Sequence, residues 1–171
     1  MDKNNFNFEL EDKEAPFDAV KKEISVVEVA TNGYVTANID TYDGKINYQT
    51  SIASIVSAFN DNLEENIQDK LGELENEICT YEIFLSVKGL DNYKYRILFL
   101  EYGSISYPTT VVLNNDIADY CIGKSKTKYL IYNEKDLKKM IDRIINSDYF
   151  IKIVQNLINE ALRRESRERS K

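Results

Sequence analysis

The stretch CTYEIFLSVKGLDNYKYRILFLEYGSISYPTTVVL, from Cys79 to Leu113, decides the fold of this chain. It contains three runs of β-branched, aromatic and aliphatic residues, separated by turn-forming segments at 88–92 and 103–105. Such runs, bounded by Gly, Asn, Asp and Ser, are typical of strands joined by short connections. The sequence therefore predicts three consecutive antiparallel strands.

The register of these strands follows from the alternation of side chains between the two sheet faces. Pairing Val87 with Tyr93 places most of the apolar and tyrosine side chains on one face, which we expect to pack against helices. That face carries Tyr81, Ile83, Leu85, Val87, Tyr93, Tyr95, Ile97, Phe99, Thr109, Val111 and Leu113. The tyrosines are then core residues.

The reverse face of this predicted sheet is half apolar. Its apolar end carries Phe84, Leu98, Leu100 and Val112. An apolar patch of this kind is covered by another part of the chain or marks an interaction site. The N-terminal segment, a partner and a second copy of the chain remain open as covers, and we take these four residues as candidate partner-binding residues.

The N-terminal third is predicted to hold an acidic mobile arm at 1–20 and then a small β-meander. The meander comprises strands at 23–31, 34–41 and 45–48, joined by the turn dipeptides Asn32-Gly33 and Asp43-Gly44.

A long helix is predicted at about 51–71, because its apolar residues recur every three or four positions. The stripe comprises Ile52, Ile55, Val56, Phe59, Leu63, Ile67 and Leu71. Asp61, Glu64, Glu65 and Asp69 lie on or beside the opposite face. These carboxylates form either a solvated helix back or an acidic surface for a basic partner.

The C-terminal part is predicted to hold a short strand at 118–122, a strand at 127–132 and two helices, at about 134–145 and 148–164. Asn133 and Ser147 are the expected helix caps, because their side-chain oxygens can accept from free amides of the first turn. Residues 166–171 are expected to form a disordered charged tail. Residues 21–165 therefore form one α+β domain with an antiparallel sheet.

Composition excludes several chemistries. The 171 residues include no histidine and only two cysteines, Cys79 and Cys121, and no GxxxxGK[ST] or GxGxxG motif occurs. Catalytic triads with a histidine base, histidine or thiolate zinc sites and the common nucleotide-binding loops are thereby excluded. We expect no cofactor, no metal and no catalysis.

Charge is distributed unevenly along the chain. The net charge is −7 overall; residues 1–80 contain 17 acidic and 6 basic residues, whereas residues 81–171 contain 12 and 16. The acidic half favours a partner with a basic surface. No apolar run of membrane-spanning length and no secretion signal are present, so we expect a cytoplasmic protein that does not enter a membrane.

Part of the chain resembles uncharacterised small bacterial α+β proteins. The residues that carry the resemblance are Tyr95-Arg96-Ile97-Leu98, Glu101-Tyr102, Tyr107-Pro108-Thr109-Thr110-Val111, Asn133-Glu134, Leu137, Ile144-Ile145-Asn146-Ser147, Val154 and Leu157. They span about residues 79–162, and the resemblance implies no activity.

These observations favour a non-catalytic protein-binding module, such as an inhibitor, immunity or accessory protein of a bacterium or mobile element. The acidic helix face and the mixed sheet face would meet a partner protein, and a homodimer stays open. A metal-dependent enzyme that uses carboxylates is one alternative. A nucleic-acid binder that uses Lys124, Lys126, Lys128 and the 163–169 tail is the other, which the acidic total disfavours.

Overall fold

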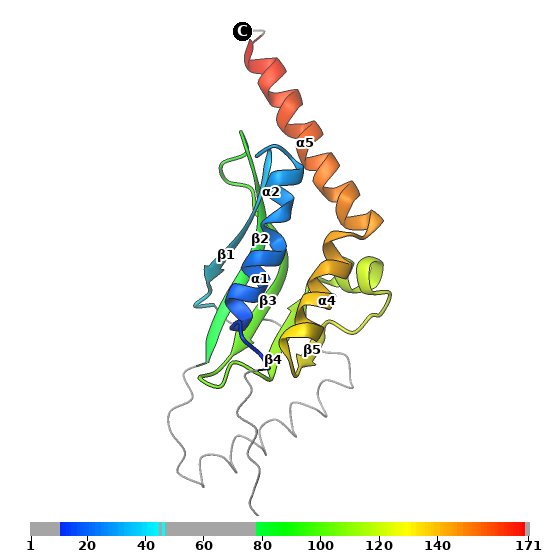
Figure 1. Ribbon diagram of the computed structural model, residues 1–171. Coiled ribbons are helices and arrows are strands. Elements are labelled where there is room, and N and C mark those ends of the chain that lie inside the picture. The colour runs from blue at the N-terminus through cyan, green and yellow to red at the C-terminus, as the bar shows by residue number, and fades with distance from the viewer. Residues whose placement is uncertain (1–10, 45, 47–77, 170–171) are drawn as a thin grey trace, which may run out of the picture.

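The computed structural model describes residues 11–44, 46 and 78–169. It confirms the α+β class: a five-stranded antiparallel sheet carries helices on one face (Figure 1). The elements in chain order are α1 (Pro16–Ile24), α2 (Val26–Ala30), β1 (Val35–Thr41), β2 (Cys79–Val87), β3 (Tyr95–Tyr102), β4 (Thr109–Leu113), η1 (Ile117–Ile122), β5 (Lys128–Ile131), α4 (Glu134–Ile145) and α5 (Asp148–Arg169).

The described strands lie side by side in chain order, β1-β2-β3-β4-β5, and each is antiparallel to the next. The three predicted strands of the 79–113 stretch are its centre, and β1 and β5 form its edges. The predicted strands at 34–41 and 127–132 are confirmed as these two edges.

The predicted register holds for only half of the β2–β3 pair. Leu85 pairs with Tyr95 and Phe84 with Arg96, as the Val87–Tyr93 pairing requires, but Ile83 then pairs with Leu98. Ile97 is an extra residue on β3 and forms a β-bulge. A one-residue shift exchanges the two faces of every residue beyond it.

The bulge corrects two predictions. Leu98 and Leu100, expected on the reverse face, lie in the core at 1% and 0% exposure. Phe99, expected in the core, pairs with Glu82 and Val112 on the reverse face. Tyr93 precedes β3 and is 42% exposed, so it is no core residue either.

The core lies between the sheet and the helices. α1 packs against α4, and both α1 and α2 contact β1. The largest fully buried side chains are Phe150, Ile83, Leu85, Leu98, Leu100, Ile117, Leu137, Ile141, Ile144, Val20, Val35 and Val111. The N-terminal and C-terminal helices thus share one sheet face.

The predicted strand at 23–31 is wrong, because this segment is helical in α1 and α2. Pro16 occupies the first turn of α1, where its missing amide costs nothing. Ala19, Val20, Ile24 and Val27 are buried, and their spacing matches a helix facing the core. Residues 16–20 therefore belong to the domain, whereas the predicted mobile arm at 1–20 included them.

Asn32 and Gly33 have positive φ angles of 51° and 76°. Both residues adopt the left-handed backbone conformation on which the hairpin prediction was based. The dipeptide nevertheless joins helix α2 to strand β1 and does not join two strands. The prediction of a hairpin at this position is therefore wrong.

The C-terminal helices begin where predicted. The Asn133 side chain accepts from the Asp136 amide at 2.8 Å, and Ser147 Oγ accepts from the Phe150 amide at 3.2 Å. α5 continues to Arg169, past its predicted end, so residues 166–169 are helical. The predicted strand at 118–122 is a π-helical turn, η1.

The predicted helix at about 51–71 lies outside the described residues, as do residues 1–10 and almost all of the predicted 45–48 strand. Within residues 11–44, 46 and 78–169, no helix is both long and apolar enough to cross a membrane.

Two leucines test the corrected register. Leu100→Ala should lower the free energy of unfolding by about 2–5 kcal/mol, because it opens a cavity in the core. Leu130→Ala, on the outer side of β5 and 50% exposed, should change it by no more than about 0.5 kcal/mol. Urea denaturation measures both; equal losses would contradict the register.

Candidate protein-binding surface

One face of the sheet is covered by no helix of the described chain. We call it the outer face. It carries Asn38, Asp40, Glu82, Phe84, Ser86, Arg96, Phe99, Val112, Thr110 and Leu130, which follow from the strand registers. Tyr42, directly after β1, contacts Phe99 at 4.7 Å between ring centroids.

Glu82 is the electrostatic centre of the outer face. It is only 8% exposed and accepts from Arg96 at 2.7 Å and from Lys94 at 3.2 Å. Burial alone would raise the pKa of Glu82, but the hydrogen bonds from Arg96 and Lys94 outweigh it, so the pKa lies below its ordinary value. Lys94 also reaches Asp40 at 3.8 Å.

Three aromatic rings surround these cations. The Lys94 ammonium lies 4.0 Å from the centroid of the Phe84 ring, and the Arg96 guanidinium lies 4.7 Å from Phe99 and 5.4 Å from Tyr42. Cation–π contacts and the Glu82 carboxylate together fix both side chains. Arg96 stays 45% and Lys94 54% exposed, so both remain available to a partner.

The structure separates the predicted partner-binding residues. Phe84 and Val112 do lie on the outer face, at 4% and 6% exposure. Leu98 and Leu100 lie in the core instead. Asp61, Glu64, Glu65 and Asp69 lie outside the described residues.

The sequence did not indicate that Tyr42 and Phe99 join Glu82, Lys94 and Arg96 in one cluster. The alternation of Glu82 with Phe84 on one strand and Lys94 with Arg96 on the next was a usable signal. It pointed to a cross-strand charge pairing. Phe99 could not be added, because its position depends on the bulge.

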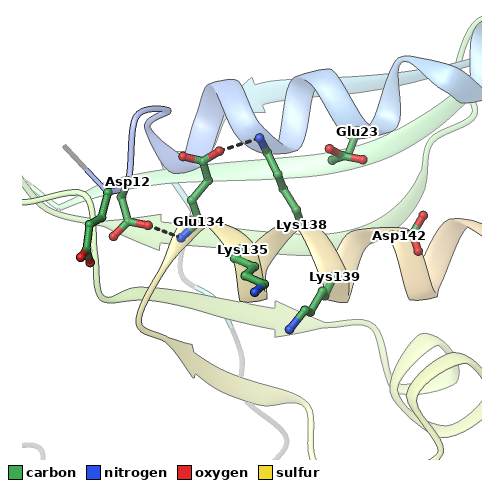
Figure 2. Close-up of a pocket in the computed structure, with 8 residues that line it drawn as sticks. Asp12, Glu23, Glu134, Lys135, Lys138, Lys139 and Asp142 are labelled. Atoms are coloured by element: carbon green, nitrogen blue, oxygen red, sulfur yellow. Dashed lines mark hydrogen bonds and ion pairs between the residues drawn. The ribbon is translucent and has the colours of Figure 1, made fainter. Parts of the chain in front are cut away.

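A second candidate site is a cavity of about 520 Å³ on the helical side (Figure 2). It lies between the segment before α1, α1 and α4. Its lining comprises Glu11, Asp12, Glu23, Glu134, Lys135, Lys138, Lys139 and Asp142.

The charged side chains at one end of this cavity pair with one another or with the backbone. The Glu134 amide donates to Asp12 Oδ1 at 2.8 Å, and Lys138 pairs with the Glu134 carboxylate at 2.6 Å (Figure 2). Lys138 also pairs with Glu14 at 2.7 Å. The hydrogen bonds from Lys138 lower the pKa values of both carboxyls. This end of the cavity therefore attaches the segment before α1 to the first turn of α4.

Acidic and thiol side chains were the remaining candidates for chemistry in a chain without histidine. Among the described residues, no group of three or more Asp, Glu or Cys side chains could hold a metal ion. Cys121 is buried, burial raises the pKa of its thiol, and Ser147 Oγ donates to its sulfur at 3.0 Å. A buried, protonated thiol is a poor nucleophile.

Comparison of the chain with protein-family models, with curated proteins and with solved structures gave no significant match. The resemblance of residues 79–162 to small bacterial α+β proteins therefore stays a prediction.

The Glu82 network predicts a specific pH dependence. Because the folded pKa of Glu82 lies below the unfolded value, the unfolded chain binds more protons, and stability is lost as pH falls through the folded pKa. The contribution is fully present only above the ordinary value of 4.5. Glu82→Gln should therefore reduce stability at neutral pH and flatten the acid limb of the stability curve.

Asp91→Asn, at an exposed carboxylate in the β2–β3 turn, is the matched control. Urea unfolding between about pH 3 and pH 7 measures both variants, a range that brackets ordinary carboxyl titration. An unchanged acid limb in Glu82→Gln would show that the network does not stabilise the sheet.

Proposed function

We propose that the protein is a non-catalytic protein-binding module whose partner presents a basic surface. The observation that carries the proposal of a binding surface is the outer face, where Glu82 and the rings of Tyr42 and Phe99 hold Arg96 in place while Arg96 stays half exposed. Tyrosine and arginine are enriched among residues that dominate binding energy at interfaces. Side chains that are already fixed lose less entropy when a partner binds.

Charge supports a basic partner. Residues 1–80 carry a net charge of −11, from 17 acidic and 6 basic residues. Asp61, Glu64, Glu65 and Asp69 give this half a dense run of carboxylates. Complementary charge speeds association and selects among partners more than it adds affinity.

The proposal extends to the role of an inhibitor, immunity or accessory protein in the cytoplasm of a bacterium or in a mobile element. Each of these roles requires surface recognition and no chemistry of the chain's own. The carboxylate-enzyme alternative lacks a metal-holding group within residues 11–44, 46 and 78–169.

One observation favours nucleic-acid binding as a second candidate. α5 continues beyond Ala161, its last fully buried residue, and this end carries Arg163, Arg164, Arg167 and Arg169. Glu160 pairs with Arg163 and Arg164, and the net charge of −7 repels a polyanion. The protein-binding proposal is therefore the stronger one.

Affinity capture with purified tagged protein tests the role of the acidic residues. After the captured partner is identified and purified, the triple variant E64K/E65K/D69K should weaken its binding by about tenfold or more and reduce the salt dependence. Titration calorimetry at two salt concentrations provides the measurement.

The triple variant D91K/D119K/E165K is the matched control, because it changes the net charge equally at three described carboxylates outside the acidic run. It should retain binding. Equal losses in the two variants would mean that only net charge matters, and unchanged binding by E64K/E65K/D69K would contradict the proposal.

A further inference from the structure

Within residues 11–44, 46 and 78–169, β1 is an unguarded edge of the sheet. Its seven residues, Val35–Thr41, pair with β2 in one continuous register without a bulge. No described strand lies on its other side, as the position of β1 at the sheet margin in Figure 1 illustrates. The strand contains no proline and no lysine, the residues that most often block such edges.

The backbone groups that face away from β2 can be identified. Lys88 N donates to Tyr34 O at 3.0 Å, and Tyr42 N donates to Thr80 O at 2.8 Å. Even-numbered residues therefore face β2, and the backbone groups of the odd-numbered ones point outward.

The outward groups of Val35 are already satisfied. Thr31 Oγ1 accepts from the Val35 amide at 3.1 Å and donates to the Val35 carbonyl at 3.0 Å. No hydrogen bond within the described residues reaches the outward amides and carbonyls of Ala37, Ile39 and Thr41. Within the described part of the chain, three successive outward positions are therefore open to pairing with an added strand.

The opposite edge, β5, differs from β1 in length and in lysine content. β5 has only four residues and begins at Lys128, and the segment before it carries Lys124 and Lys126. Short length and lysines are the usual protection against edge pairing. Among the residues that the structure describes, one edge of the sheet is thus protected and the other is open.

The side chains beside β1 define the chemistry of a matching strand. On the outer face, Asp40 is 57% exposed, and Asp43 follows β1 as another exposed carboxylate. On the opposite face, Ala37 and Ile39 extend the core, and α2, which packs on β1, leaves Val26 49% and Val29 78% exposed. One side of an added strand would meet carboxylates and the other side apolar groups.

We propose that β1 binds an extended segment of the partner protein by β-strand addition, and that this segment alternates apolar residues with lysine or arginine. Main-chain hydrogen bonds to Ala37, Ile39 and Thr41 supply affinity, and the alternating side chains supply specificity. The inference deepens the proposed function and rests on it for the basic character of the partner.

Residue-resolved amide exchange by NMR tests whether the edge is free. In the isolated protein, the amides of Thr36, Asn38 and Asp40 should exchange slowly and those of Ala37, Ile39 and Thr41 fast. Slow exchange at all six positions in the monomer would overturn the inference. The same protection seen only at high concentration, with a dimer mass by light scattering, would assign the edge to a second copy and also overturn it.

Binding is tested with a labelled synthetic peptide of about ten residues, an ordinary strand length, that alternates valine and lysine. Its addition should slow amide exchange at Ala37, Ile39 and Thr41. A peptide N-methylated at alternate residues, which cannot pair along one edge, should bind at least about tenfold more weakly.

Two protein variants complete the design. Thr41→Pro removes an outward amide without touching the β1–β2 ladder and should weaken the peptide at least about tenfold, whereas the control Thr41→Val should not. Asp40→Asn should weaken the valine–lysine peptide and leave a valine–threonine peptide unchanged. Binding that is indifferent to both N-methylation and Thr41→Pro would overturn strand addition, whatever the fate of the acidic-run variants.

Discussion

The β-bulge at Ile97 is the constraint on which the rest of the structure depends. Phe84 pairs with Arg96, and the next pair along the ladder joins Ile83 to Leu98. This single inserted residue turns Leu98 and Leu100 into the core and turns Phe99 out. Without it, β3 would present two leucines to the outer face and bury a phenylalanine beneath the helices.

The bulge also assembles the outer-face cluster. Because Phe99 lies opposite Glu82 on the outer face, its ring contacts Arg96 of the same strand, β3. The ring also contacts Tyr42, the residue that follows β1. Glu82 can remain nearly buried because Arg96 and Lys94 satisfy it. The same two cations also lie over aromatic rings, so that Lys94 and Arg96 are held in place on the outer face. The described helices meanwhile pack on the other face and bury the core there.

Much of this fold could be predicted from sequence where local signals agree. The strands at 79–113, the caps at Asn133 and Ser147 and the boundaries of α4 depend on turn and capping chemistry within a few residues. The bulge could not be predicted, because all four residues of Ile97-Leu98-Phe99-Leu100 are apolar. Without alternation of apolar and polar residues, the sequence does not show which of them face the core. Residues 23–31 misled for a related reason: their β-branched residues favour a strand, whereas packing of Ile24 and Val27 on the core selects a helix. The sequence therefore predicted the sheet face of Phe84 and Val112 correctly, and it placed Leu98, Leu100 and Phe99, whose faces depend on the bulge, on the wrong sides.

Measuring the register of β2 against β3 tests the bulge, and with it the core and the outer face, most directly. Cross-strand NOEs between backbone protons in isotope-labelled protein report which residues face each other. We expect contacts from Ile83 to Leu98, from Glu82 to Phe99 and from Tyr81 to Leu100. Contacts from Ile83 to Ile97 and from Tyr81 to Phe99 would show a continuous ladder without a bulge, and would contradict both the core and the outer face described for this protein.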